Sequence, residues 1–554
     1  MTAPRRLGSA IVALTLLTAA VVASPGAAGA QGKGASLLEQ GQVPAWLKYN
    51  RPAQYKTVSE EIRVPMRDGV LMRCSKLGPA GSDGRPLAGK QPVVVTDFFA
   101  YRLLQYATTG LPEPLAERGY VTLTCSPRGS GGTPGAWRPF QKQESQDNYD
   151  LIEWAAAQPW STGKIGEVGI SYGGISTYKA VSMHPPHLAA AVPIVAFSNA
   201  YREIVYPGGA AGTALRWWPV ATGVTAQADQ PGAAAMSLPD YLGMGEQWRA
   251  HPTEDAYWKP WSIDGKAIGS STVPILGIGG WADLFPDGMV RNYLAAKAHS
   301  HLLMLPGAHL NFLPGDPDWP VVAHAMLSWF DQYLMKLSDV PQPGARITSW
   351  QQPHYSGHWT ELPDWPTRTR RLAWTGPWGP DTTELYPLAV NPYDNGCGCV
   401  EHGAYNSADL PQNDQRLQDT ERVRWDIGPV DHDTVLVGTP VMHLTAALPA
   451  PDGNIVVRLE DLAPGGASYV ITTGWLRASH RLSQEHPTAL EPNRPYDFTI
   501  PMWPTDWNIK TGHFLRLTVS SGDLQMIEPI GQSNSMIMVY AGKFGSTIDL
   551  PFEG

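Results

Sequence analysis

A serine with glycines on both sides carries the strongest chemical signal in this sequence. Ser171 lies in the stretch Gly-Ile-Ser-Tyr-Gly-Gly at residues 169–174. Residues 165–168 before it predict a short buried strand, and residues 175–183 after it predict a helix. Glycines allow a turn tight enough to raise the serine Oγ above a sheet as a nucleophile. We therefore predict that Ser171 attacks a carbonyl carbon. The alternative is a glycine-rich turn without chemistry.

Two further residues, His309 and Asp283, could activate the Ser171 hydroxyl. A serine becomes a good nucleophile when a base takes its proton and a third group orients that base. Each residue follows a predicted strand, residues 301–305 for the histidine and residues 273–277 for the acid. The order serine, acid, histidine is the order found with this kind of turn. The sequence therefore predicts a catalytic triad of these three residues.

Four other titratable residues compete for these roles and fit them less well. Asp287 lies at a predicted helix start, where capping or surface exposure is the usual role. His184 and His187 flank a Pro-Pro pair after the predicted helix, and His301 begins a predicted strand. The acid and base of a triad instead follow the ends of late strands.

The negative oxygen formed during acyl transfer needs hydrogen-bond donors. The backbone N–H of Tyr172, directly after the serine, is the first predicted donor. The second should come from the loop after the predicted strand 93–96, which reads Asp-Phe-Phe-Ala-Tyr-Arg over residues 97–102. We predict the Tyr101 hydroxyl for this task, with an ordinary packed tyrosine as the alternative.

The chain around these residues alternates short apolar runs with helical patterns, which is typical of a mostly parallel sheet covered by helices. Residues 50–335 therefore predict an α/β-hydrolase domain. The alternation stops over residues 200–270, and this segment predicts a helical cap insertion over the active-site mouth. Residues 340–554 carry short alternating runs between turns rich in Pro, Thr, Asp and Gly. They predict a C-terminal all-β jelly-roll domain.

The N-terminus has the pattern of a secretory signal peptide. Arg5 and Arg6 precede an apolar stretch over residues 7–23, and Ala-Gly-Ala at residues 28–30 fits a cleavage site. Loss of residues 1–30 removes two of the 41 basic residues and none of the 50 acidic ones, so the net charge falls from −9 to −11. We expect a secreted protein, with no membrane attachment after cleavage and no nucleic-acid partner.

Export permits disulfides, and the sequence holds four cysteines. Cys74 and Cys125 lie in predicted strands that are neighbours in the α/β-hydrolase order, so a disulfide between them is geometrically possible. Two buried free thiols are the alternative. Cys397 and Cys399 lie in a Gly/Asn-rich loop that could form a small disulfide or a weak metal site. Because no cluster of His and Cys partners supports them, we predict no metal. Acyl transfer needs no cofactor, and none is predicted.

Seven further segments carry a likeness that runs through both predicted domains. They are residues 64–70 (Val-Pro-Met-Arg-Asp-Gly-Val), 127–132 (Pro-Arg-Gly-Ser-Gly-Gly), 280–283 (Gly-Trp-Ala-Asp), 438–440 (Gly-Thr-Pro), 458–461 (Arg-Leu-Glu-Asp), 474–480 (Gly-Trp-Leu-Arg-Ala-Ser-His) and 512–517 (Gly-His-Phe-Leu-Arg-Leu). Together with residues 169–174, they resemble the cocaine esterase and Xaa-Pro dipeptidyl-peptidase family of α/β-hydrolase serine hydrolases. The resemblance spans about residues 55–545.

This resemblance implies the same triad, a helical cap, a C-terminal jelly roll and a tyrosine hydroxyl that completes the oxyanion hole. The family usually has a Pro-Tyr pair after its third strand, whereas residues 98–101 here read Phe-Phe-Ala-Tyr. Either Tyr101 or Phe99 therefore takes the tyrosine position, and a phenylalanine has no hydrogen bond to donate.

The resemblance leaves two classes of substrate open, a small peptide or an ester. An Xaa-Pro dipeptidyl-peptidase is the leading prediction. It needs a carboxylate for the free amine of the substrate, and Glu203 at the start of the insertion is the candidate. The alternative is a carboxylesterase or acylase of the cocaine esterase type, which needs only a largely apolar acyl pocket. Trp281, close to the predicted acid, is a further predicted substrate contact.

A third interpretation belongs to another class, a non-catalytic surface protein that binds carbohydrate. Exposed tryptophans of the C-terminal half would then stack on sugars, and the candidates are Trp359, Trp365, Trp374 and Trp378. Burial of these side chains at domain interfaces is the competing explanation.

Overall fold

The structure is a computed structural model that describes residues 36–100, 110–215, 218, 238–309, 311–353, 356–374, 384–389, 414–523, 526–530, 536–541 and 545–552. The predicted signal peptide, Tyr101, Trp378, Cys397 and Cys399 lie outside the described residues.

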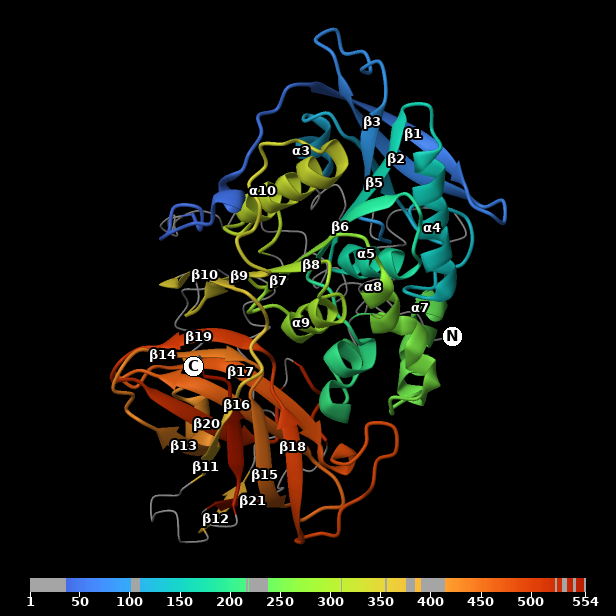
Figure 1. Cartoon of the computed structure of the whole chain (residues 1–554). Coiled ribbons are helices and arrows are strands. Elements are labelled where there is room, and N and C mark those ends of the chain that lie inside the picture. Colours follow the sequence, from blue (N-terminus) through green and yellow to red (C-terminus); the bar gives the residue numbers. More distant parts are fainter. Residues whose placement is uncertain are drawn as a thin grey trace, which may run out of the picture.

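A mixed sheet of ten strands forms the centre of the N-terminal domain (Figure 1). Its order is β1-β2-β4-β3-β5-β6-β7-β8-β9-β10, parallel from β4 to β9 and antiparallel at both edges. Apolar runs such as Val93–Val95 are fully buried, as expected for parallel strands covered on both faces. The strands are β1 (Lys56–Pro65), β2 (Leu71–Ala80), β3 (Gln91–Thr96), β4 (Val121–Cys125), β5 (Ser161–Ile170), β6 (Leu188–Ile194), β7 (Ile275–Gly280), β8 (Ser300–Leu305), β9 (Ile347–Gln351) and β10 (His358–Leu362).

Helices cover both faces of this sheet. The apolar side chains of α4 (Lys142–Ala156), α5 (Tyr172–Ser182) and α9 (Pro286–Ala295) belong to the core on one face. Those of α3 (Pro112–Ala116) and α10 (Trp319–Phe330) belong to the core on the other. This arrangement is the α/β-hydrolase fold class that the sequence predicts. Within the described ranges, no helix is long and apolar enough to cross a membrane.

Cys74 and Cys125 form a disulfide between neighbouring strands. β2 and β4 pair antiparallel in a register that sets these two residues opposite each other. Their sulfurs are bonded. Of the two alternatives that the sequence leaves open, the structure has the disulfide.

The insertion predicted as a cap is helical where the structure describes it. Its elements are η2 (Tyr201–Val205), η3 (Pro207–Gly209), α7 (Leu238–Ala250), η4 (Ala256–Trp261) and α8 (Gly265–Ser270). Lys179 of α5 holds the last part of the insertion. Its buried ammonium donates to the carbonyl oxygen of Pro260 at 2.7 Å and to that of Ser262 at 2.9 Å. The insertion therefore packs on the helix that begins next to Ser171.

The same insertion reaches the C-terminal domain. The backbone N–H of Thr213 donates to the carbonyl oxygen of Met526 at 3.0 Å, and the N–H of Glu528 donates to that of Ala211 at 2.6 Å. In Figure 1 the green insertion lies between the upper domain and the orange and red strands below it. It thus links the two domains.

The C-terminal domain is built from antiparallel strands around a second core. One sheet has the order β11-β22-β15-β21-β12, with β18 also paired to β15, and another has the order β13-β20-β16-β17, while β14 pairs with β19. The strands are β11 (Arg370–Ala373), β12 (Glu384–Ala389), β13 (Val423–Ile427), β14 (Thr434–Gly438), β15 (Val441–Ala447), β16 (Asn454–Leu462), β17 (Ser468–Arg477), β18 (Pro495–Pro501), β19 (Thr505–Ile509), β20 (Phe514–Ser520), β21 (Met536–Ala541) and β22 (Thr547–Leu550). This is the all-β domain that the spacing of short runs predicts.

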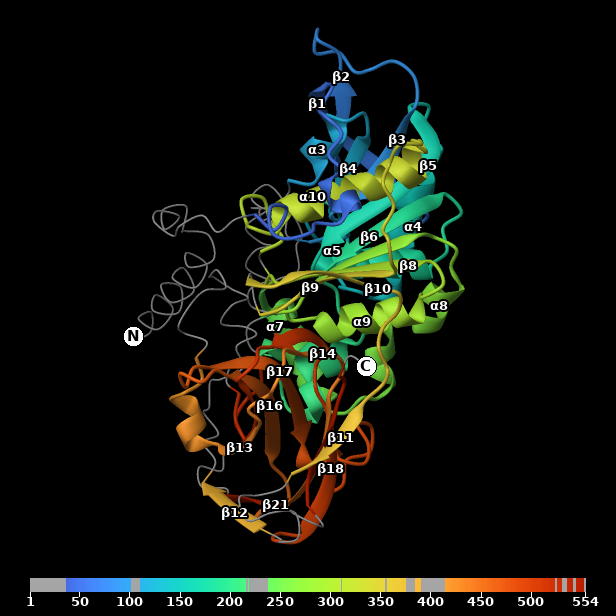
Figure 2. The same cartoon turned by 60° about the vertical axis from the view of Figure 1, so that its left-hand side comes forward.

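Two strands beyond the predicted domain boundary at residues 335–340 belong to the first sheet. β9 and β10 follow that boundary but join β8 as the last two strands of the ten-stranded sheet. Both views show them at the edge that faces the β domain (Figures 1 and 2). Gln352, just after β9, continues this contact, because its N–H donates to Asp506 O and its carbonyl accepts from Asn508 N, each at 2.9 Å. A short alternating run has the same pattern in either sheet, so only tertiary pairing decides where it belongs.

Three of the tryptophans named for sugar binding are buried. Trp359, Trp365 and Trp374 keep 8%, 7% and 1% of their surfaces exposed. The Trp359 indole donates to the carbonyl oxygen of Leu37 at 3.0 Å. These side chains are therefore core and interface residues, which is the alternative to sugar stacking that the sequence analysis gives.

Candidate active site

Ser171 lies at the sharp turn between β5 and α5. Its backbone has φ 58° and ψ −114°, a conformation that L-residues rarely adopt. The turn also needs its glycines: a Cβ at Gly169 would lie 2.5 Å from the carbonyl carbon of Gly173. A Cβ at Gly174 would lie 2.3 Å from the carbonyl oxygen of Ile194. The local sequence therefore forms a strained nucleophile turn, as its spacing predicts.

His309 and Asp283 meet Ser171 in a continuous chain of hydrogen bonds. The Nε2 atom of His309 is 2.8 Å from Ser171 Oγ, and its Nδ1 atom is 2.5 Å from Asp283 Oδ1. The second carboxylate oxygen of Asp283 accepts from the N–H of Phe285 at 2.8 Å. The Asp283 side chain is fully buried, whereas that of His309 is 17% exposed. This geometry can pass the serine proton to the imidazole and stabilise the imidazolium that forms.

The competing residues have other partners. His187 Nδ1 lies 2.7 Å from Glu153 on the surface, and His301 Nδ1 lies 3.2 Å from the carbonyl oxygen of Ala345. Asp287 forms an ion pair with Arg291 one turn along α9. His184 is exposed after α5.

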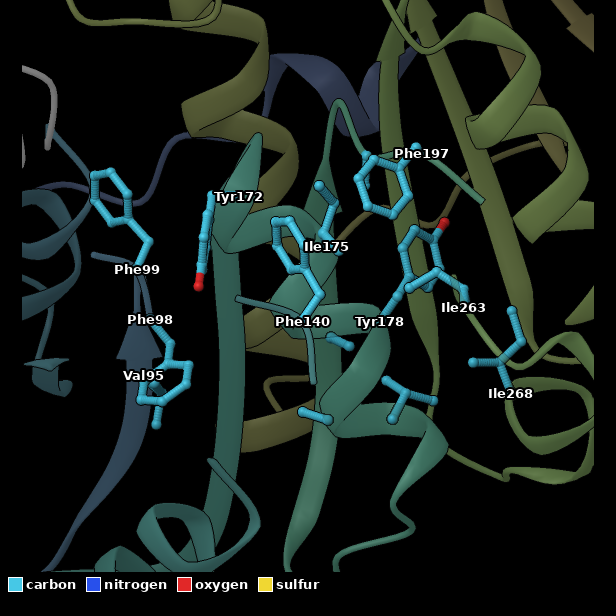
Figure 3. Close-up of a cluster of buried hydrophobic side chains, with 14 of the residues drawn as sticks. Val95, Phe98, Phe99, Phe140, Tyr172, Ile175, Tyr178, Phe197, Ile263 and Ile268 are labelled. Atoms are coloured by element: carbon cyan, nitrogen blue, oxygen red, sulfur yellow. The ribbon is translucent and has the colours of Figure 1, made fainter. Parts of the chain in front are cut away.

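The oxyanion site is described on one side only. Tyr172 is the first residue of α5, so its N–H lies at a helix N-terminus next to Ser171. The second predicted donor, Tyr101, lies outside the described residues. Phe99 is buried with its ring centre 6.4 Å from that of Tyr172, and Figure 3 shows the two side by side.

Asp97 is a supporting residue that the sequence analysis missed. It follows β3, is 3% exposed, and accepts the N–H of Ile170 at 3.1 Å. Its own N–H donates to the carbonyl oxygen of Val168 at 2.9 Å. Burial raises the pKa of this carboxyl to about 7. Asp97 therefore fixes the end of β5 just before Ser171. An acid directly after a buried strand was the signal that could have identified it.

Glu203 does not hold the predicted place at the mouth of the site. Its carboxylate is 2% exposed and accepts the N–H groups of Ser198 at 3.0 Å and Asn199 at 2.7 Å. Burial, and then the charge of Asp287, raise its pKa to about 8. The prediction that it receives a substrate amine is therefore wrong, because its oxygens already satisfy a backbone turn.

Trp281 is also a packing residue rather than a substrate contact. It is 7% exposed, and its indole N–H donates to the carbonyl oxygen of Trp350 in β9 at 3.0 Å. Its ring lies 6.3 Å from that of Trp365. It joins the loop after β7 to the sheet edge, which corrects the prediction.

Aromatic side chains gather beside Tyr172. Phe140 lies 4.4 Å from the Tyr172 ring and 5.4 Å from Phe197, measured between ring centres, and Figure 3 shows all three together. From the insertion, Trp218 stacks on Phe140 at 6.3 Å and on Trp248 at 5.3 Å. The surroundings of the serine turn are therefore strongly apolar.

A separate cleft of about 720 Å³ lies between the insertion and the β domain. Its walls include Arg202, Glu254, Trp258 and Trp503, and no member of the triad lines it. It is therefore separate from the site around Ser171. In the described part of the chain, no group of three or more His, Cys, Asp or Glu side chains is placed to hold a metal ion.

Comparison with known proteins agrees with this geometry. Residues 68–311 match the X-Pro dipeptidyl-peptidase family (S15 family), and residues 341–548 match the X-Pro dipeptidyl-peptidase C-terminal non-catalytic domain. The chain belongs to the cocaine esterase and X-Pro dipeptidyl-peptidase family of serine hydrolases.

Relatives of both kinds share most of this chain. A cocaine esterase of Rhodococcus sp. (strain MB1 Bresler) is 24% identical over 534 residues, which cover 84% of this chain and 91% of that protein. A putative Xaa-Pro dipeptidyl-peptidase of Bacillus anthracis is 21% identical over 433 residues, 73% of this chain and 69% of that one. Among solved structures, a CocE/NonD family hydrolase of Staphylococcus aureus has a TM-score of 0.73 at 20% identity, covering 90% of this chain and 94% of that one.

Proposed function

We propose that this serine hydrolase is an esterase that forms an acyl-enzyme on Ser171. His309 takes the serine proton as Oγ attacks the ester carbonyl, and Asp283 stabilises the resulting imidazolium. The Tyr172 N–H stabilises the oxyanion of the tetrahedral intermediate. His309 then protonates the leaving alcohol. A water, activated by the same imidazole, releases the acid and restores the serine.

The environment of Glu203 favours an ester over a dipeptide amide as the substrate. A dipeptidyl-peptidase needs a carboxylate that is free to bind the substrate ammonium, whereas Glu203 is buried and accepts two backbone N–H groups. An ester needs only an apolar acyl site, and the packing of Phe140, Phe197 and Trp218 makes the surroundings of the serine turn apolar. We therefore infer an ester with an apolar acyl group as the substrate class.

The second candidate is an Xaa-Pro dipeptidyl-peptidase, which the match of residues 68–311 favours. Hydrolysis of p-nitrophenyl butyrate and of Gly-Pro-p-nitroanilide, each by the parent and by Ser171→Ala, separates the two. The esterase proposal predicts release from the butyrate alone, lost in the variant. Serine-dependent release from the dipeptide amide at a comparable kcat/KM would overturn it in favour of the peptidase.

A further inference from the structure

Tyr172 is held at its side-chain end by two buried partners. Its hydroxyl donates to Glu144 Oε2 at 2.5 Å and accepts from the indole N–H of Trp137 at 2.9 Å. All three side chains are at least 96% buried. The residue whose N–H faces the oxyanion is therefore fixed from the distant end of its own side chain.

Glu144 also holds the turn that carries Phe140. The N–H of Phe140 donates to Glu144 Oε1 at 3.2 Å. Phe140 has φ 59°, a conformation that a bulky residue adopts only when its surroundings impose it. Its ring lies between Tyr172 and Trp218 of the insertion. One carboxyl group thus holds both Tyr172 and the aromatic ring packed beside it, and Figure 3 shows the two rings side by side.

Helix capping explains only half of this arrangement. Glu144 is the third residue of α4, and a glutamate there commonly reaches back to a backbone N–H before the helix. That role accounts for the bond to Phe140 N–H. It does not account for the second oxygen, which receives the Tyr172 hydroxyl from another helix.

We propose that Glu144 is a positioning residue for the hydrolytic reaction, acting through the Tyr172 side chain on the oxyanion donor, the Tyr172 N–H. This inference rests on the proposed function and names a further residue for the same site. Because a preorganised donor acts mainly on the transition state, loss of Glu144 should lower kcat and leave KM nearly unchanged.

Glu144→Gln tests the proposal because the two bonds use different carboxylate oxygens. With the amide oxygen on Phe140 N–H, the amide nitrogen faces the Tyr172 hydroxyl, which already accepts from Trp137 and loses the oxygen to which it donates. Tyr172→Phe removes the donor of the same hydrogen bond, and it tests the proposal if Glu144→Gln fails to fold. Two controls match them in burial. Glu167→Gln alters a fully buried glutamate that accepts from Asn148 at 2.8 Å, and Tyr178→Phe removes a buried α5 hydroxyl that has no hydrogen-bond partner.

The measurements are kcat and KM for p-nitrophenyl butyrate, and inhibition by a trifluoromethyl ketone, which forms an oxyanion on the serine. Both test variants should lose about tenfold or more in kcat and in affinity for the ketone, with KM within about twofold. The double variant should lose no more than the larger single loss, since both changes remove the same hydrogen bond between Glu144 and the Tyr172 hydroxyl. A kcat and a ketone affinity within about twofold of the parent in both variants, or equal losses in the two controls, would overturn the proposal. If the parent shows no turnover that Ser171→Ala abolishes, the proposed function itself fails, which is a distinct result.

Discussion

The Oδ1 atom of Asp283 lies 2.5 Å from Nδ1 of His309, although 26 residues separate them in the chain. The reason is the register of two parallel strands. Gly280 at the end of β7 pairs with Leu305 at the end of β8, so the loops that follow both strands leave the same sheet edge. Asp283 and His309 therefore meet because neighbouring strands end together, and the residues between them form α9 and then β8.

Asp283→Asn should lower kcat by about ten-thousandfold with little change in KM. An asparagine favours the wrong tautomer of the imidazole and cannot stabilise its charge. The measurement is steady-state hydrolysis of p-nitrophenyl butyrate. Asp287→Asn is the matched control, because that acid lies four residues further on and pairs with Arg291. Retention of most activity by Asp283→Asn, or an equal loss in the control, would refute the acid assignment.

The Asp97→Asn variant should gain stability relative to the parent as the pH rises. Burial raises the pKa of Asp97 from 3.8 to about 7, so the folded state holds this proton more tightly than the unfolded chain. The stabilising contribution is present at low pH and is lost as the pH rises through this range. Asparagine cannot ionise, so the variant should gain on the parent by up to about 1.4 kcal/mol for each pH unit between the two values.

Urea unfolding of parent and Asp97→Asn at pH 5 and pH 8 measures this difference. We expect the unfolding free energy of the variant, relative to that of the parent, to be larger at pH 8 than at pH 5. The same difference in unfolding free energy at both pH values would mean that the carboxyl is not protonated in the folded state.

Replacing Cys74 and Cys125 together by alanine should destabilise the N-terminal domain. The bond closes a loop of 51 residues, which is worth about 4 kcal/mol in the chain-entropy account. Thermal unfolding with and without a reductant is the measurement, and the reductant should shift the parent but leave the double variant unmoved. A parent that melts at the same temperature under both conditions would show that the bond contributes little. The sequence also predicts export, the setting in which such a bond forms.

Gly208→Ala should weaken the contact between the insertion and the β domain. Gly208 has φ 58°, and a Cβ there would lie 1.9 Å from the carbonyl oxygen of Trp475. We expect a loss of about 2 kcal/mol, from the backbone conformation and the clash together. Gly243→Ala in α7 is the control, because a Cβ there meets nothing within 4 Å and should be neutral or stabilising. Thermal unfolding of the two variants compares them, and equal melting temperatures would argue against a tight interface at residue 208.

Local chemistry and strand order were enough to predict the serine turn, the meeting of Ser171, Asp283 and His309, and the order of the elements. The glycines that the turn requires identify Ser171 in the sequence. Asp283 and His309 are identified by their places directly after strands. Such features depend on residues close in sequence or on a regular fold, so a single sequence contains them.

Other features depended on contacts that no local pattern encodes. Glu203 resembled a free acid, but its oxygens close a turn at residues 198–199. Trp281 resembled a substrate contact, but its indole is bonded to β9. β9 and β10 resembled strands of the second domain until pairing placed them in the first sheet. In each case tertiary partners decided the role of a residue whose type alone allowed several.

The central claim is that Ser171 forms a covalent bond with the acyl group of the substrate. Its most direct test is the intact mass of the protein after reaction with an alkyl fluorophosphonate, followed by peptide mapping. The account predicts one adduct per chain, mapped to Ser171, absent in Ser171→Ala and slowed in His309→Ala. No adduct on the parent, or undiminished labelling of Ser171→Ala, would contradict it.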